Sequence, residues 1–272
     1  MISMKLFSTL LLSLIFTSFF SQKNCKGLLL DSTTNKPIEF ANIGIVGKGF
    51  GTVTNEQGEF NFIVPDSLAA SPIKISMIGY KSKTFSLATL STLSKIKLPQ
   101  AATTLNEVSV SAKKTKVKIL GNDTKTTGIT AGFVKNTLGA ELAVKLNIKH
   151  AKTHLRKFYL NVARNSIEKP IFRFNVYNKD ENGHPKDNLL TQNIIIEMKE
   201  KTGLIELDLT PYNLYVDDDV FISIEWIKDL GDVKGLYFSA KLVGSQTYFR
   251  QASQDKWQKI PVGLGLHAEV AY

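Results

Sequence analysis

The sequence has little of what several protein classes require. Its 272 residues include one cysteine, Cys25, so no disulfide can form within the chain, and a disulfide-stapled mini-protein or a cysteine-based zinc module is excluded. A wholly disordered chain is also excluded, because 43% of the residues are hydrophobic. Long apolar runs are missing after the first twenty residues. The length suits two domains of roughly 100–150 residues each.

The N-terminus has the pattern of a secretory signal. Lys5 is the only charge before an apolar run that extends from Leu6 to Leu12 and resumes as far as Phe20. A basic start, an apolar stretch of about 10–15 residues and a small residue such as Ser21 are typical of a signal peptide. A transmembrane helix would need about 20 apolar residues. We therefore expect residues 1–21 to be a signal peptide, with no transmembrane segment after cleavage; an uncleaved anchor is the alternative.

Residues 22–99 show short apolar stretches separated by turn residues. Phe60, Phe62 and Val64 alternate with polar residues, which is the period of two of a half-buried strand. Asn55 and Gly58 bracket a four-residue link with hairpin chemistry, because Asn bonds its own backbone and Gly accepts positive φ. Seven such strands in about 75 residues, with no helical stretch, predict a small β-sandwich.

Several short motifs follow one another in the same region: Gly27, Asp31, Pro37-Ile38, Ala41-Asn42-Ile43, Gly51-Thr52, Thr54 to Phe60 and Ile78 to Lys81. Together they resemble the carboxypeptidase regulatory-like domain, over about 75 residues. The resemblance implies a seven-stranded, transthyretin-like Greek-key sandwich. It also implies a non-catalytic accessory domain, of a kind frequent in exported and outer-membrane proteins of Gram-negative bacteria.

Residues 100–127 are polar and basic, with few large apolar side chains, and predict a linker. Within them, Leu105 to Ala112 is similar to the segment that follows this domain in TonB-dependent outer-membrane receptors. A last edge strand followed by a linker is the interpretation we favour, and a TonB-interacting segment is the alternative.

Alternating apolar residues return in residues 128–272. The expected strands cover Leu142–Ile148, Phe158–Val162, Phe172–Val176, Ile194–Ile196, Ile205–Leu209, Val220–Trp226, Leu236–Leu242 and Leu264–Val270. Eight or nine strands at this spacing predict a C-terminal jelly-roll-like β-sandwich, and an all-β chain. The region is also similar to the second domain that accompanies the regulatory-like domain in short exported bacterial proteins.

The sequence carries no common catalytic motif: it has no Gly-x-Ser-x-Gly elbow, phosphate loop or His-Glu-x-x-His pair. His150 and His154 would lie about 13 Å apart on a strand, too far for one metal. His184-Pro185-Lys186-Asp187 faintly resembles a carboxypeptidase zinc pair, but the chain has no room for the large α/β domain of that enzyme. A hydrolase using Asp208 and Glu225 is a formal alternative, because nothing in their spacing selects them.

Two acidic turns invite comparison with calcium sites. Residues 178–183 fit the first half of an EF-hand loop, but its twelfth position is Leu189 rather than a bidentate Glu. Asp217-Asp218-Asp219 could hold a hard cation, although a solvated turn needs only water. We favour ordinary turns in both places, and expect no metal, no cofactor and no enzymatic activity.

A binding face is the remaining candidate. If the apolar residues of each strand face the core, the residues between them point outward. The candidate ligand-binding residues are Arg173, Asn175, Tyr177, Glu225, Tyr237, Lys241, Tyr248, Arg250 and Trp257. A Tyr ring could stack on a sugar while its neighbours bond the hydroxyl groups, but ordinary cross-strand pairs on a solvated sheet are the simpler interpretation. We expect Trp226 in the core and Trp257 as an exposed anchor.

These observations predict an exported, non-enzymatic binding or structural module of the cell envelope, in the periplasm, at the outer-membrane surface or outside the cell. The expected partner is an envelope glycan or envelope protein. A nucleic acid is not expected despite the net charge of +10, because the chain has only four Arg and its Lys excess is spread over one domain and a linker. An accessory or truncated component of a TonB-dependent uptake system is the alternative. A barrel of about 22 strands cannot fit in the remaining residues. The oligomeric state stays open.

Overall fold

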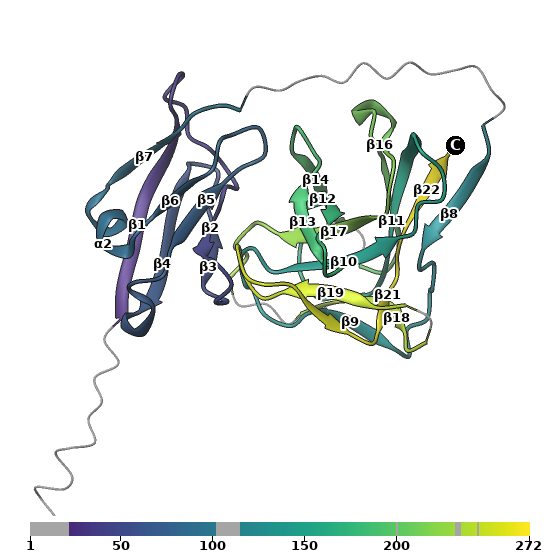
Figure 1. The fold of residues 1–272 in the computed structure, drawn as a ribbon. Coiled ribbons are helices and arrows are strands. Elements are labelled where there is room, and N and C mark those ends of the chain that lie inside the picture. Colours follow the sequence, from purple (N-terminus) through teal and green to yellow (C-terminus); the bar gives the residue numbers. More distant parts are fainter. Residues whose placement is uncertain (1–21, 102–114, 200, 232–234, 244) are drawn as a thin grey trace, which may run out of the picture.

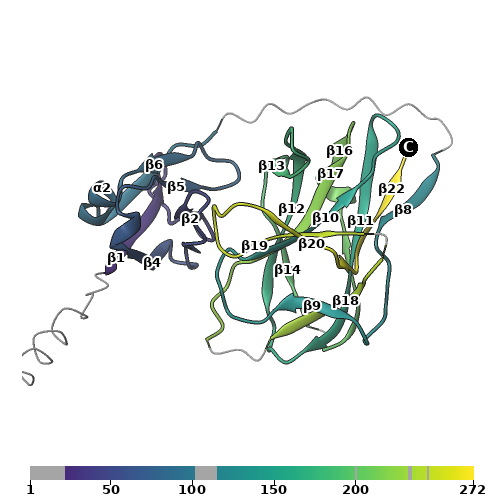
Figure 2. The same ribbon diagram turned by 60° about the horizontal axis from the view of Figure 1, so that its bottom comes forward.

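The computed structural model describes residues 22–101, 115–199, 201–231, 235–243 and 245–272. The expected signal peptide and Leu105 to Ala112 lie outside these residues. Within the described part of the chain, no helix has the length and apolar character needed to cross a membrane. Figures 1 and 2 show two β domains side by side, with β2 and β5 of the first on the side that faces the second.

The N-terminal domain confirms the predicted β-sandwich. Its strands are β1 (Gln22–Asp31), β2 (Asn42–Ile45), β3 (Gly51–Val53), β4 (Glu59–Pro65), β5 (Ile73–Ser76), β6 (Lys83–Phe85) and β7 (Lys95–Leu98). One sheet has the order β4-β1-β7 and the other β3-β2-β5-β6. The alternating residues that the sequence indicated, including Ile43, Phe60, Val64 and Ile75, fill the core between them.

The expectation of no helical stretch in this domain is wrong in detail. A short helix, α2 (Leu87–Thr92), precedes β7, and a 3-10 turn, η2 (Asp66–Leu68), follows β4. The hydroxyl of Ser86 accepts a hydrogen bond from the backbone N–H of Thr89 at 3.1 Å and caps α2. Leu87 and Leu90 lie three positions apart and are both buried. A helix of six residues is too short to give a periodic signal in the sequence.

The link from Asn55 to Gly58 has the predicted turn chemistry but a different place in the fold. Asn55 Oδ1 accepts hydrogen bonds from the backbone N–H groups of Gln57 and Glu59 at 3.0 and 2.8 Å, and Gly58 has a φ of +74°. The flanking strands β3 and β4 belong to different sheets, so the link is not a hairpin between paired strands. The turn instead carries the chain across the sandwich.

Asp31 connects two of the motifs that carry the family resemblance. Its carboxylate accepts hydrogen bonds from the backbone N–H groups of Thr33 and Thr34 at 2.7 and 2.8 Å. It also accepts one from Tyr80 Oη at 3.0 Å and one from Gln100 Nε2 at 2.7 Å. The backbone bond to Thr34 is the largest of the contributions that lower the pKa of Asp31 well below its ordinary value. The contacts place the first turn, the loop after β5 and the end of the domain against one another.

The C-terminal domain packs two larger sheets. Its elements are β8 (Val117–Gly121), β9 (Thr130–Phe133), β10 (Glu141–Leu146), β11 (Thr153–Asn165), β12 (Ile171–Lys179), β13 (Pro185–Asn188), β14 (Ile194–Glu197), β15 (Gly203–Asp208), η3 (Thr210–Tyr212), β16 (Tyr215–Val216), β17 (Val220–Trp226), β18 (Leu236–Lys241), β19 (Thr247–Arg250), β20 (Gln258–Ile260), β21 (Gly263–Leu264) and β22 (Leu266–Ala271). The seven-stranded sheet runs β13-β12-β17-β10-β19-β20 with β14 beside β12, and the eight-stranded sheet runs β21-β18-β11-β22-β8 with β9, β15 and β16 added at its sides.

One large apolar core fills the space between these sheets. Trp226 belongs to it, as predicted, and its ring meets Phe133 and Phe172 edge to face. The second domain therefore has the predicted sandwich character. It has more strands than the sequence indicated, because several of them are only two to four residues long.

The expected linker over residues 100–127 is too long at both ends. Gln100 bonds Asp31, and the N–H of Ala101 bonds the carbonyl of Gly79, so both belong to the first domain. β8 pairs with β22 and forms an edge of the eight-stranded sheet. The lysine-rich composition of this region is not typical of a strand. In addition, the strand that pairs with β8 lies at the other end of the sequence, so no local pattern indicates it.

Candidate binding site at the domain boundary

Four charged side chains form one row across the outer face of the seven-stranded sheet. Arg173 on β12 is paired in register with Glu225 on β17, Glu225 with Glu141 on β10, and Glu141 with Arg250 on β19. The inward neighbours of these residues are core residues, so the period of two turns all four side chains to the opposite face. The resulting order is cation, anion, anion, cation.

The row is buried and internally bonded. Arg173 donates to Glu225 Oε2 from Nε at 3.0 Å and from Nη2 at 2.8 Å, and Arg250 forms an ion pair with Glu141. Arg173 is 1% exposed, and both carboxylates are 0% exposed. Asn175 joins the two halves, because its Nδ2 lies 2.9 Å from Glu141 Oε1 and 3.0 Å from Glu225 Oε2. Each buried charge thus has an opposite charge beside it, which such burial requires.

Burial and neighbouring charge shift the two carboxylates in opposite directions. Burial raises the pKa of Glu141, and the negative charge of Glu225 adds to the rise against the opposing effect of Arg250. Burial also acts to raise the pKa of Glu225, but Arg173 and Arg250 outweigh it and lower that pKa. Burial raises the pKa of Tyr177 well above its ordinary value, with Glu141 nearby adding to it. Tyr177 therefore stays protonated and donates to Glu141 at 3.3 Å.

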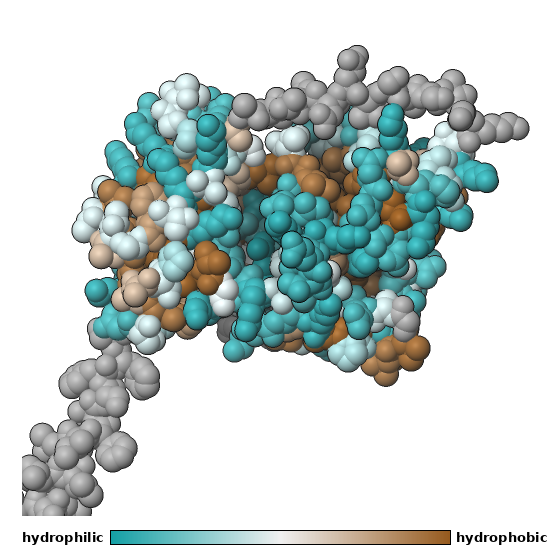
Figure 3. Space-filling model, in the orientation of Figure 1, coloured by the Kyte–Doolittle hydropathy of each residue, from teal (hydrophilic) through white to brown (hydrophobic). Residues whose placement is uncertain are grey.

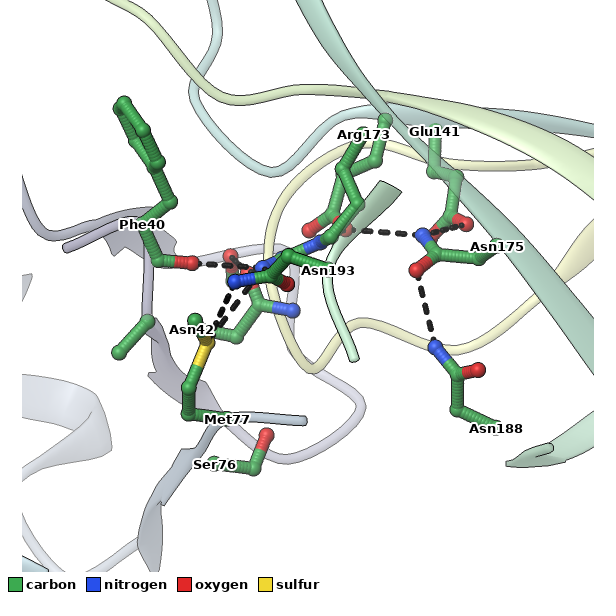
Figure 4. Close-up of polar contacts among 12 residues, drawn as sticks. Phe40, Asn42, Ser76, Met77, Glu141, Arg173, Asn175, Asn188 and Asn193 are labelled. Atoms are coloured by element: carbon green, nitrogen blue, oxygen red, sulfur yellow. Dashed lines mark hydrogen bonds and ion pairs between the residues drawn. The ribbon is translucent and has the colours of Figure 1, made fainter. Parts of the chain in front are cut away.

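Arg173 also joins the two domains. Its Nη1 donates to the backbone carbonyl of Phe40 at 2.8 Å, and its Nη2 donates to Asn42 Oδ1 at 3.1 Å. Asn42 Oδ1 accepts a second bond, from Ser253 Oγ at 3.0 Å. Figure 4 shows Phe40 and Asn42 on one side of the boundary and Arg173 reaching toward them from the other. Arg173 is thus neutralised by Glu225 of the second domain and donates a hydrogen bond to the backbone of the first.

The loop from Ala252 to Asp255 packs against glycines of the first domain. A Cβ on Gly44 would lie 2.1 Å from the carbonyl oxygen of Ser253, and a Cβ on Gly51 would lie 2.5 Å from the same atom. The N–H of Gly47 donates to the carbonyl of Gln254 at 2.9 Å, and Gln254 Nε2 donates to Ser76 Oγ at 2.7 Å. Glycine in β2 and β3 therefore permits the close approach of the second domain.

Other contacts extend the boundary. Phe40 and Val53 of the first domain form an apolar cluster with Ile227 of the second. Lys228 forms an ion pair with Glu56 at 2.8 Å. The two sandwiches therefore meet through apolar, polar and charged contacts together.

A polar recess opens beside this row, between the two domains. It has a volume of about 390 Å³. Its polar lining consists of Asn42, Lys74, Ser76, Tyr80 and Ser82 from the first domain and Arg173, Asn175, Tyr177, Lys186, Asp187, Asn188, Arg250 and Gln254 from the second. Figure 3 shows a hydrophilic hollow at this boundary. The floor consists of sheet faces, and β13 with the loop after β5 forms its sides.

The structure brings most of the predicted binding residues to one face. Arg173, Asn175, Tyr177 and Arg250 line the recess, and Glu225 lies beneath it. Trp257 is partly exposed and packs edge to face on Tyr177 at 5.7 Å, with the guanidinium of Arg250 5.1 Å from its ring centre. Tyr248 is buried beside Phe221 in the same cluster.

Two of the predicted residues lie elsewhere. Tyr237 and Lys241 are on β18, which belongs to the eight-stranded sheet, and Tyr237 packs against Arg164 there. The period of two tells which side of its own strand a residue occupies, but not which sheet the strand joins. The expected solvated sheet is also wrong for the row itself, because the first domain and the loop of Ser253 cover it.

Several residues of the site were missed. Glu141, Ser223 and Asn188 belong to the network or its edge: Ser223 donates to Glu141, and Asn188 Nδ2 donates to Asn175 Oδ1 at 2.9 Å. Glu141 precedes the alternating run that starts at Leu142, so the same period of two could have found it. Asn42, Ser76 and Gln254 give no such signal, because they depend on how the domains meet.

The turns considered for metal binding have ordinary partners. Asp180 Oδ1 accepts from the N–H groups of Asn182 and His184 at 2.9 and 2.7 Å, as in a hairpin turn. Asp219 forms an ion pair with Lys145 at 2.7 Å, and Asp218 bonds Lys179 at 3.0 Å. Across the residues that the structure describes, no three His, Cys, Asp or Glu side chains gather as they would around a metal ion.

His150 and His154 do not face each other across a site. His150 stacks on Tyr272 at 4.0 Å, and His154 stacks on Tyr215 at 4.5 Å. Asp208, which was paired with Glu225 in the hydrolase alternative, lies on β15 beside β11 in the opposite sheet, where it bonds Thr210. The two acids therefore do not share a site.

Carboxylates with oppositely shifted pKa values are a pattern seen in acid–base catalysis. Here Glu141 and Glu225 lie below the lining, bonded to Arg250 and Arg173, and neither lines the recess. Their geometry holds the two arginines in place. The recess presents amide, hydroxyl, ammonium and guanidinium groups to a ligand, together with the carboxylate of Asp187.

Comparison with solved structures adds little. Two structures of infectious bursal disease virus, of the Gx and Gt strains, are similar at 12% and 13% identity over 92% of this chain, each with a TM-score of 0.32. The chain spans 63% and 62% of the length of those chains. A likeness at that score supports no argument about fold or function. None of the curated proteins matches the chain.

The family comparison agrees with the first domain. The family model described as CarboxypepD_reg-like domain matches residues 25–110. This range includes most of β1, the six other strands of the first sandwich and all the motifs from Asp31 to Lys81. The chain therefore contains a carboxypeptidase regulatory-like domain.

Proposed function

We propose that this protein is an exported, non-catalytic binding module of the cell envelope, which holds a glycan in the recess between its two domains. The observation that carries the proposal is the recess itself, because sheet faces of both domains contribute polar side chains to one concave surface. Its volume of about 390 Å³ lies within the range of roughly 300–1,000 Å³ for small-ligand sites.

The chemistry of the lining supports a hydroxyl-rich ligand. Asn42, Asn188 and Gln254 carry amide groups, and Ser76 and Ser82 carry hydroxyls. Amides and hydroxyls both donate and accept hydrogen bonds, so they match a sugar, whose hydroxyl groups do the same. Met77, Ile78 and Leu190 add a small apolar area.

The rigidity of the floor supports binding rather than turnover. The carboxylates of Glu141 and Glu225 form ion pairs with Arg250 and Arg173, and these ion pairs hold the two arginines in place at the recess. A preorganised polar surface loses little conformational entropy when a ligand binds. The regulatory-like domain is itself a non-catalytic module, and it supplies part of the lining.

A binding test uses the whole chain and a change that fills the recess. Ser82 is exposed and lines the recess, so Ser82→Trp should block entry without touching the buried row. Thr127 is exposed and does not line the recess, so Thr127→Trp is the matched control. On an array of envelope glycans, we expect binding by the wild type and Thr127→Trp, and loss in Ser82→Trp. The same glycans should be recovered uncleaved after incubation.

Binding that survives Ser82→Trp would contradict the location of the site, and cleavage of a glycan would contradict the non-catalytic role. The export part of the proposal rests on the signal pattern of residues 1–21. Cell fractionation with mass spectrometry of the mature N-terminus tests it. A mature chain beginning near Gln22 in the envelope or medium is expected, and an intact cytoplasmic chain would contradict export.

A further inference from the structure

Two cationic side chains of the recess lining, one from each domain, have donor groups without a partner in the protein. Arg250 directs Nη2 to Glu141 and Tyr177, and its Nε is buried without a hydrogen-bond partner, as is Oε1 of Glu225, which lies 3.8 Å from Arg250 Nη2. Its side chain is 10% exposed. Among the described residues, Lys74 has no hydrogen-bond or ion-pair partner at its ammonium group. A buried donor left unsatisfied is costly, so such a group calls for a partner, for which water, an ion or a ligand can serve.

The fold directs Lys74 toward the second domain. Its neighbours Ile73 and Ile75 are fully buried in the first core, so the side chain of Lys74 lies on the opposite face of β5. On that face Lys74 is paired in register with Gly44, and Ser76 with Asn42. Asn42 and Ser76 both bond the second domain, so Lys74 lies at the same boundary.

The charges around the recess do not cancel. Four cations line it: Lys74, Arg173, Lys186 and Arg250. They meet three carboxylates, which are Asp187 in the lining and Glu141 and Glu225 beneath it. The two arginines are matched by the two buried glutamates, whereas neither Lys74 nor Lys186 forms an ion pair within the described part of the chain. The four cations exceed the three carboxylates by one positive charge, and an anionic group on the ligand would match that excess.

The shape of the recess favours a sugar over a peptide as the carrier of that group. Peptides that bind sheets usually add a strand to a sheet edge, where backbone N–H and C=O groups are free. The floor here consists of sheet faces, in which β5 and β12 lie between other strands. The floor therefore offers side-chain amides, hydroxyls and cations, and the edge strand β13 borders the recess without forming its floor.

We propose that the ligand of this recess is an acidic oligosaccharide, whose carboxylate or equivalent anionic group binds between Lys74 and Arg250 while its hydroxyl groups bond the surrounding amides. This inference rests on the proposed function and names the ligand class for the same site. Long-range attraction to the basic first domain would assist its capture.

Calorimetric titration with trigalacturonate and with its methyl ester tests the inference, because esterification removes the charge and keeps the sugar. We expect the acid to bind and the ester to bind at least about tenfold more weakly, as for loss of one charged hydrogen bond. Lys74→Gln should remove most of this difference. Lys36→Gln removes an exposed lysine outside the recess and should preserve it. Affinity for the acid should fall as salt is added.

Several outcomes would overturn the inference. If acid and ester bind equally, and Lys74→Gln changes neither affinity, the inference of an acidic ligand is contradicted. The proposed glycan-binding function is then still supported. Inorganic phosphate binding as tightly as trigalacturonate would reduce the site to a simple anion site. Triglutamate binding in place of the sugar would replace the ligand class. Failure of every sugar tested, charged or neutral, would overturn the proposed function as well.

Discussion

Replacing Gly44 with alanine should separate the two domains while leaving each of them folded. The new Cβ would lie 2.1 Å from the carbonyl oxygen of Ser253 and 2.9 Å from its carbonyl carbon. Within its own domain, its nearest neighbour would be the carbonyl oxygen of Phe50 at 3.1 Å, which requires only a small adjustment. Gly44 lies in β2, and alanine is less unfavourable in a strand than glycine. The clash is therefore almost entirely between the domains.

The size of the effect follows from the contacts that the clash displaces. The loop of Ser253 would have to recede by roughly 1 Å, and overpacking of this kind costs about 1–3 kcal/mol. Withdrawal would also break the bonds from Gly47 to Gln254 at 2.9 Å and from Ser253 to Asn42 at 3.0 Å. Each such bond contributes about 0.5–1.5 kcal/mol net. A total of about 2–6 kcal/mol is large for an interface between domains of one chain.

Urea unfolding followed by two probes measures the result. Trp226 and Trp257 are both in the second domain, so tryptophan fluorescence reports on that domain while far-UV circular dichroism reports on both. We expect coincident transitions in the wild type and separate transitions in Gly44→Ala. Gly128 has ordinary φ, and a Cβ there would meet only Thr126 Oγ1 at 3.7 Å, an ordinary contact, so Gly128→Ala is the control and should match the wild type. Coincident, unshifted transitions in Gly44→Ala would refute the docking argument.

Three further predictions concern single groups. Asp31 has a lowered pKa in the folded chain, so its contribution to stability is present above its unfolded pKa of about 3.9 and is lost as pH falls below that value; urea midpoints of Asp31→Asn should therefore depend less on pH between 3 and 6, and an unchanged dependence would contradict this. Arg173→Met leaves Glu225 without its closest cation and should lower the unfolding free energy by about 3–5 kcal/mol, with partial recovery when Glu225→Gln is added; a double variant as unstable as the sum of both changes would show that the pair is not coupled. Trp257 is partly exposed and Trp226 buried, so emission from Trp226→Phe should lie at longer wavelength than emission from Trp257→Phe, and equal maxima would rule out this placement.

Much of the fold could be predicted because each sandwich uses the period of two. Phe60 to Val64 and Phe172 to Val176 alternate plainly, and both segments are strands with the expected core faces. The same rule placed Arg173, Asn175 and Tyr177 on one outer face. Glu141 obeys the same rule, but it lies one residue before Leu142, the first apolar residue of its strand.

What the sequence could not give was the identity of each strand's neighbours. β8 follows a lysine-rich stretch, but its partner β22 is near the C-terminus. By the period of two, Tyr237 and Arg250 both point away from the core, yet their strands belong to different sheets. Sheet membership depends on contacts between distant segments, which local alternation does not encode.

The burial of the charged row was equally hidden. Charged residues such as Arg173 and Glu225 are typical of a solvated sheet face. They are buried because the first domain covers them, and Arg173 bonds Phe40 and Asn42, which lie more than 130 residues earlier in the chain. Gly44 and Gly51 belong to strands in which small residues suggest a turn or bulge. Their role at the domain boundary appears only when Ser253 is seen against them.

The central claim is that the two domains form one body around the recess, and an interdomain distance measurement tests it most directly. Spin labels at exposed Lys95 and Glu168, in a Cys25→Ala background, place one probe on each domain away from the recess. Double electron–electron resonance should give one narrow distance distribution without any ligand, and a broad one when Gly44→Ala is added. A broad distribution in the chain with intact Gly44 would contradict the account.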